Sequence, residues 1–106
     1  MSVQQVIVPN NMNTLMSFEQ EVSTYLSSGA DVQFVDDSGK ECNISYIGIF
    51  GGSDGAIKSR VVGQIDAQAK TRTYAYGGFM AVPMSYIYAS GTDTGLVLIV
   101  RAKLPQ

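Results

Sequence analysis

The chain of 106 residues contains no histidine and a single cysteine. Without histidine it lacks the most common general base in enzymes and the most common side-chain ligand of metal ions. With only Cys42, the usual zinc ligand sets cannot be assembled within one chain, and no nucleophile that depends on a histidine partner can exist. We therefore expect a protein that is not an enzyme and that uses no metal or cofactor.

The lone cysteine also excludes a disulfide within the chain, so the simplest compartment is a reducing one. We expect Cys42 to be a small buried side chain in a strand. No stretch approaches the roughly 18 apolar residues of a membrane-spanning helix, and the first residues show no basic segment followed by a long apolar run. These absences predict a cytoplasmic or virion protein without a membrane segment or an export signal.

Charged residues are scarce, at 15% of the chain against about 25% in ordinary soluble domains. The hydrophobic share of 45% excludes a disordered chain, and the length predicts a single domain over residues 1–106. A lightly charged surface is typical of a protein that packs against copies of itself, which favours a homo-oligomer.

Acidic residues dominate up to Ile57 and basic residues from Lys58 onward. This asymmetry favours head-to-tail association or an anionic partner, unless the two halves interleave and neutralise each other.

The N-terminal part of the sequence predicts a strand and then the only helix. Residues 3–8 (VQQVIV) are mostly β-branched and precede Pro9, which indicates a strand. An amphipathic helix over residues 13–28 is predicted next, with Asn11 or Asn13 as its cap and Gly29 after its end. The prediction depends on apolar residues spaced by three and four, namely Leu15, Phe18, Val22, Tyr25 and Leu26.

From residue 31 onward the sequence alternates strand-like segments with turns. The segment DVQFV (31–35) leads through a polar turn, DDSGKE (36–41), into CNISYIGIF (42–50) as the second arm of a hairpin. Further strands are predicted within 56–69, 72–76, 84–90 and 95–100, and GGFMAVP (77–83) is predicted to be a loop or bulge.

The predicted fold class is α+β, with the one helix packed on an antiparallel sheet of about six to seven strands. A small β-sandwich or barrel with one helix is the alternative. The segments ISYIGIF and LVLIV are apolar on both faces, and one helix covers only one face of a sheet. Another subunit, or a sheet that curls on itself, must cover the other face.

The segment FGGSDGAIKSR (50–60) has a composition similar to that of a phosphate-binding loop. Such a loop requires a glycine immediately before its lysine and a helix immediately after it. Ile57 precedes Lys58, however, and the residues after Ser59 (RVVGQI) have no helical period. The segment therefore predicts a turn between two strands.

Tyrosines give the best candidate binding site. Tyr74 and Tyr76 are two residues apart, as are Tyr86 and Tyr88, so each pair lies on one face of an extended strand. Basic residues surround them in the sequence, and basic side chains beside aromatic rings are typical of surfaces that bind single-stranded nucleic acid. Tyrosines on a sheet also pack under helices or at subunit interfaces. The candidate ligand-binding residues are Tyr74, Tyr76, Tyr86, Tyr88, Lys58, Arg60, Lys70 and Arg72.

The sequence as a whole favours a non-catalytic protein that associates with itself or binds a protein partner, such as a component of a virion or another assembly. One alternative is a binder of a small ligand, an anionic ligand or nucleic acid that uses the tyrosine and basic residues. A second alternative is a small inhibitor that docks on a partner enzyme through its acidic half.

Overall fold

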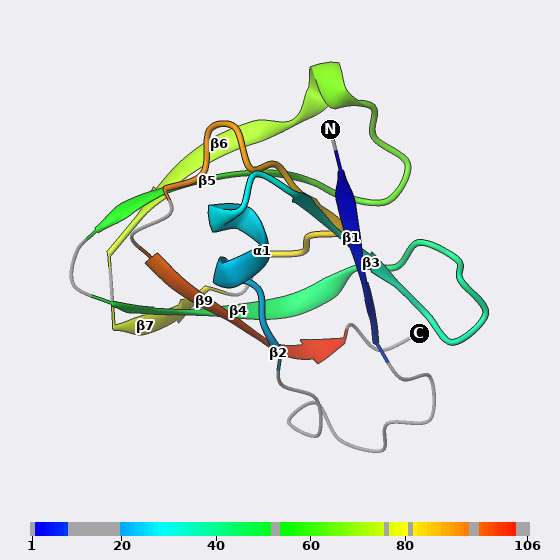
Figure 1. Cartoon of the computed structure of the whole chain (residues 1–106), viewed down its shortest axis with the longest axis horizontal. Coiled ribbons are helices and arrows are strands. Elements are labelled where there is room, and N and C mark those ends of the chain that lie inside the picture. The colour runs from blue at the N-terminus through cyan, green and yellow to red at the C-terminus, as the bar shows by residue number, and fades with distance from the viewer. Residues whose placement is uncertain are drawn as a thin grey trace.

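The computed structural model describes residues 2–8, 20–51, 54–75, 77–80, 82–93 and 96–103. They form an α+β fold with little helix (Figure 1). The elements in chain order are β1 (Val3–Ile7), β2 (Gln20–Glu21), α1 (Ser23–Ser27), β3 (Asp31–Val35), β4 (Ile44–Gly51), β5 (Gly55–Arg60), the 3-10 helix η1 (Asp66–Gln68), β6 (Lys70–Tyr74), β7 (Gly78–Met80), β8 (Tyr86–Ile87) and β9 (Leu96–Lys103).

One sheet is mixed and has five strands in the order β1-β3-β8-β5-β6. Strand β1 runs parallel to β3, and every other pair in this sheet is antiparallel. A second, antiparallel sheet has the order β2-β9-β4-β7. The predicted single antiparallel sheet is therefore wrong in two respects. The connection from β1 to β3 passes through β2 and α1, and a connection of this length permits parallel pairing where a tight turn does not.

The helix predicted over residues 13–28 is not confirmed. The described part of that range contains β2 and the five-residue α1, and residues 13–19, with the proposed Asn11 and Asn13 caps, lie outside the described ranges. Val22 and Leu26 of the apolar pattern are buried, and Gly29 ends the helix with a φ of +90°. The local sequence SxxxSS forms helix poorly because serine hydroxyls compete for backbone hydrogen bonds. Gln20 and Glu21 pair instead with β9.

Helix α1 contacts both β3 and β9, and it lies near the centre of the view in Figure 1 with β5 and β6 above it and β4 and β9 below. Alternate residues of the five-stranded sheet point to this interior. The largest side chains that are almost fully buried are Phe34, Ile44, Ile57, Met84, Ile87, Val8, Val22 and Val32.

Cys42 is buried in this core as a free thiol, as predicted. It lies in the connection before β4, however, and not in a strand. Its N–H donates a hydrogen bond of 3.0 Å to the carbonyl of Phe34.

The predicted hairpin of residues 31–50 and the predicted loop or bulge of residues 77–83 are both wrong in part. Strand β4 pairs with β9 and β7, so the hairpin from β3 is limited to the bridge between Val35 and Glu41. The segment 77–83 contains β7 where a loop or bulge was predicted. The prediction that β9 is apolar on both faces concerns side chains outside those that the structure describes. No helix in the described ranges has the length and apolar character to span a bilayer.

The turn after β3 forms around Asp36, as its sequence predicts. The carboxylate Oδ1 accepts hydrogen bonds from the N–H of Ser38 (3.0 Å), the hydroxyl of Ser38 (2.7 Å) and the N–H of Lys40 (3.0 Å). Gly39 takes a φ of +85°, which glycine adopts without steric cost.

We expect Asp36→Ala to lower the free energy of unfolding by about 1–2 kcal/mol, because three donors in the turn lose their acceptor. Asp36→Asn keeps an oxygen at the same position and should lose less than half as much. Urea unfolding of both variants checks this. Equal losses would show that the charge of Asp36, and not its role as an acceptor, stabilises the turn.

Candidate binding site

Four of the predicted site residues lie together on one face of the five-stranded sheet because β5 and β8 are neighbours. The register places Arg60 opposite Tyr86, and the N–H of Tyr88 donates to the carbonyl of Lys58 at 2.9 Å. The Arg60 guanidinium lies 4.4 Å from the centre of the Tyr86 ring, and Lys58 Nζ lies 5.1 Å from that of Tyr88. The two tyrosine rings are 4.8 Å apart.

The hydroxyl groups of both tyrosines are already hydrogen-bonded. The Tyr86 hydroxyl donates to Asp31 Oδ2 at 2.8 Å, and Asp31 Oδ1 accepts from the N–H of Ala89 at 2.8 Å. The Tyr88 hydroxyl donates to Asp66 Oδ1 at 2.5 Å. Because ring faces and hydroxyls are engaged within the chain, these tyrosines hold strands together. Their role in binding a ligand remains a prediction.

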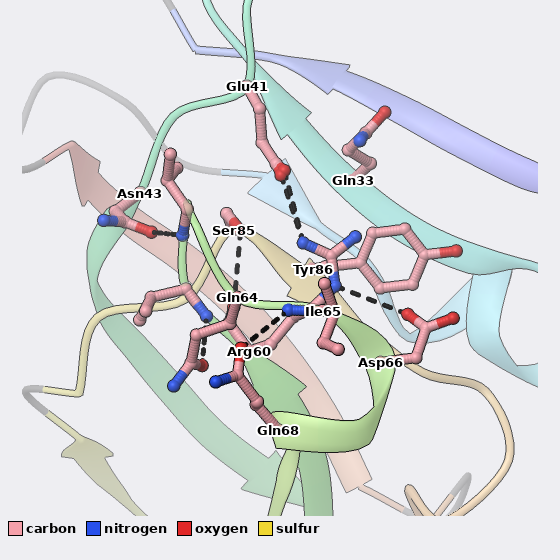
Figure 2. A network of polar contacts seen from close by, with 12 residues as sticks. Gln33, Glu41, Asn43, Arg60, Gln64, Ile65, Asp66, Gln68, Ser85 and Tyr86 are labelled. Atoms are coloured by element: carbon pink, nitrogen blue, oxygen red, sulfur yellow. Dashed lines mark hydrogen bonds and ion pairs between the residues drawn. The ribbon is translucent and has the colours of Figure 1, made fainter.

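Arg60 ties this face to two connections of the chain (Figure 2). Its Nη1 donates to Glu41 Oε1 at 3.2 Å, its Nε donates to the hydroxyl of Tyr88 at 2.9 Å, and Nε lies 3.5 Å from Asp66 Oδ1. Burial lowers the pKa of Arg60, but the hydrogen bonds to Tyr88 and Glu41 and the charge of Glu41 outweigh it, so the net pKa is raised. Here the acidic and basic halves of the sequence neutralise each other locally.

The other described members of the predicted site lie on the opposite face. Strand β5 separates β6 from β8, and the register places Lys70 opposite Ser59 and Arg72 opposite Ile57. Because side chains alternate along a strand, Lys70, Arg72 and Tyr74 share the face of Ser59 and Ile57, and not that of Lys58 and Arg60. A cluster that joins Tyr74 to Tyr86 and Tyr88 is therefore not formed. Tyr76 lies outside the described residues.

Tyr74 is buried, with 7% of its surface exposed, and no hydrogen-bond partner for its hydroxyl lies in the described part of the chain. Burial raises the pKa of this phenol, and Arg72 opposes the rise through its positive charge and through the approach of its guanidinium to the hydroxyl. A buried hydroxyl without a partner costs stability.

The glycine-rich segment does not have the geometry of a phosphate-binding loop. Lys58 and Ser59 lie inside β5, where the motif requires the start of a helix. Gly51 ends β4 and Gly55 begins β5 in the other sheet, so the segment connects two sheets and is not a hairpin turn. Ser53 and its neighbour Gly52 lie outside the described residues.

Across the ranges that are described, no three His, Cys, Asp or Glu side chains are placed to hold a metal ion.

That β1 is an edge strand, with a neighbouring strand on one side only among the described residues, was not predicted from the sequence. Strand β1 is the last strand of its sheet, and the N–H of Val8 and the carbonyl of Ser2 make hydrogen bonds to β3. Because these groups alternate along a strand, the backbone groups of Val3, Gln5 and Ile7 point away from β3. Val3 is 46% and Ile7 60% exposed. The absence of any charge in residues 2–8 was the signal that could have identified this edge.

We predict opposite effects of the same change at two tyrosines. Tyr86→Phe should lower the free energy of unfolding by about 1–3 kcal/mol, because Asp31 loses a hydrogen bond to a part-buried carboxylate. Tyr74→Phe removes a buried hydroxyl that has no partner at hydrogen-bond distance among the described residues, so stability should stay unchanged or rise by about 1 kcal/mol. Denaturant unfolding measures both. A loss at Tyr74 as large as that at Tyr86 would mean that the Tyr74 hydroxyl has a partner in solution.

Tyr86 should also make stability depend on pH. Burial, and then the hydrogen bond to Asp31 and its charge, raise the pKa of Tyr86, so the folded protein keeps a proton that the unfolded chain loses near pH 10. This contribution is complete below about pH 10 and is lost as the pH rises further. The stability difference between wild type and Tyr86→Phe should be constant from pH 7 to 9 and shrink toward pH 11.5. A constant difference over the whole range would contradict the assignment.

Comparison with known proteins adds no family to these observations. No protein-family model matches the chain, and no curated protein or solved structure matches it significantly. We therefore infer function from the residues and geometry of this chain.

Proposed function

We propose that the chain is a non-catalytic protein that associates with itself by pairing β1 of one copy with β1 of a second copy. The observation that carries the proposal is the outer edge of β1, where no strand in the described part of the chain pairs with the backbone beside the apolar side chains of Val3 and Ile7. Strand edges of this kind are templates for pairing, and proteins that remain monomeric usually protect them with charges or proline. Residues 2–8 contain neither.

The sequence of β1 is complementary to itself in one antiparallel register. Centred on Gln5, this register places Gln5 opposite Gln5 of the second copy and Val3 opposite its Ile7. The outward backbone groups belong to these same residues, so each facing pair can exchange both hydrogen bonds. Two five-stranded sheets would then continue into one, related by a twofold axis.

The exposed face around β1 supports the same contact. Gln5 Nε2 donates to Gln33 Oε1 at 3.1 Å, so the face beside the edge carries neutral polar groups and apolar side chains. The Gln4 side chain donates to the carbonyl of Gln5 at 3.1 Å, which satisfies one lone pair of that oxygen and leaves the other. Residues 2–8 carry no charge that would repel the same segment of a second copy. A protein of this kind suits a component of a virion or another assembly.

The alternatives have less support from the described contacts. A stacking platform for nucleic acid needs free aromatic faces, whereas Tyr86 lies between the Arg60 guanidinium and the Tyr88 ring. An inhibitor that docks through acidic groups needs free carboxylates, whereas Asp31 and Glu41 are bonded within the chain.

The experiment uses the twofold register. Gln5→Lys should weaken association by about 1 kcal/mol, roughly fivefold in the dissociation constant, because two like charges face each other across the axis. Gln5→Glu should weaken it for the same reason. An equimolar mixture of the two variants should restore association, since position 5 then pairs opposite charges. Sedimentation equilibrium over a concentration series measures all three samples.

Thr71→Lys and Thr71→Glu, on exposed positions of β6 at the far edge of the sheet, are the matched controls and should associate like wild type. A wild-type mass equal to one chain at every concentration would overturn the proposal. Association that is insensitive to charge at position 5 but sensitive at position 71 would move the contact to β6.

A further inference from the structure

A pocket of about 240 Å³ lies where β5 ends and β6 begins, at the edge of the sheet opposite to β1. The chain leaves β5 at Arg60, turns through a hydrogen bond from the N–H of Gln64 to the carbonyl of Val61, and returns at Lys70. The pocket is therefore framed by the two arms and the connection of one hairpin. Its lining residues are Ser59, Val61, Gln64, Lys70, Arg72 and Pro83, together with Arg60 at the end of β5.

Every charged residue that lines this pocket is basic. Lys70 and Arg72 lie two residues apart on one face of β6, about 7 Å apart along the strand. In the part of the chain that the structure describes, neither has a carboxylate within ion-pair distance. Arg60 differs, because its guanidinium is engaged by Glu41 and Asp66. Among the described residues, therefore, these two cations at the pocket have no counter-charge.

Neutral hydrogen-bond donors accompany the two cations. The Oε1 of Gln64 accepts from the N–H of Val61 at 3.1 Å, which fixes the orientation of the amide and leaves its NH₂ group as a donor at the pocket wall. Figure 2 shows this side chain turned back toward its own loop. Ser59 contributes a hydroxyl group to the same lining. The functional groups of the pocket are therefore suited to an oxyanion.

We propose that this pocket binds a phosphate group. A phosphate monoester carries about −1.5 to −2 charges at pH 7, which matches the two unpaired cations, whereas a carboxylate would leave one of them uncompensated. The planar guanidinium of Arg72 can hold two phosphate oxygens at once, and Lys70 supplies a point charge. The pocket is smaller than the roughly 300–1,000 Å³ of sites for drug-sized ligands, so it fits a phosphate group better than a larger molecule.

The test is a titration of ¹⁵N-labelled protein with inorganic phosphate at constant ionic strength, followed by backbone amide chemical shifts. We expect saturable shifts centred on residues 59, 64 and 70–72. Arg72→Gln and Lys70→Gln should each weaken binding at least tenfold, and both positions are exposed or half-buried, so the fold should persist. Lys40→Gln, which removes an exposed lysine in the turn after β3, is the matched control and should bind like wild type.

Two further comparisons define the ligand. Binding of ribose 5-phosphate should tighten between pH 5 and 7.5, because a phosphate monoester loses its second proton near pH 6. Acetate should bind at least tenfold more weakly than phosphate, and equal binding of acetate would overturn the preference for phosphate. Tighter binding of ribose 5-phosphate than of inorganic phosphate would identify a phosphorylated small molecule as the source, and equal binding would identify the free ion. Absence of saturable shifts with both phosphate probes, or equal binding by wild type and Arg72→Gln, would overturn the proposal.

Discussion

The guanidinium of Arg60 is the contact on which one face of the five-stranded sheet depends. Arg60 is the last residue of β5, and its guanidinium packs over the ring of Tyr86 in β8. It also donates hydrogen bonds to Glu41, before β4, and to Tyr88, after β8. A charge with only 13% of its side chain exposed must be matched by partners, because an unpaired buried charge costs several kcal/mol. The sheet, the connection to β4 and η1 are thereby held in one arrangement.

This constraint separates the polar groups that build the fold from those that remain for a partner. Asp31, Glu41, Tyr86 and Tyr88 satisfy each other or the backbone, so a ligand would have to break existing contacts to use them. Two sets of groups at opposite edges of the five-stranded sheet differ from these. Uncharged backbone and apolar side chains lie on β1, and Lys70 and Arg72, which have no carboxylate partner among the described residues, lie beside the pocket at β6.

The sequence was sufficient for features that depend on neighbours along the chain. The turn at Asp36, the burial of Cys42 and the position of Gly29 after the helix end follow from local chemistry, and all three are confirmed. The pairing of tyrosines by face was predictable in the same way, since alternation is a local property of strands.

Features that depend on which strands are neighbours were not predictable. Nothing in residues 31–103 shows that β5 lies between β6 and β8, yet this order places Tyr74 on the opposite face from Tyr86 and Tyr88. The parallel partnership of β1 and β3 was missed although a helix was predicted between them, because the strands after residue 31, which are joined by short turns, were taken to set the direction of the whole sheet. The helix prediction failed for a similar reason, because Gln20 and Glu21 pair with a strand about 80 residues later in the chain.

The unlike edges of the five-stranded sheet limit the stoichiometry of any assembly built from it. A permissive edge is one to which the strand of another copy can pair. A subunit with two such edges can bind two other copies and polymerise into a fibril, as stacked strands do in amyloid. Here β6 carries Lys70 and Arg72 within three residues, so a second β6 brought alongside would place like charges close together. If copies pair through β1 as proposed, this sheet offers one permissive edge, and growth through β1 would end when two copies have met.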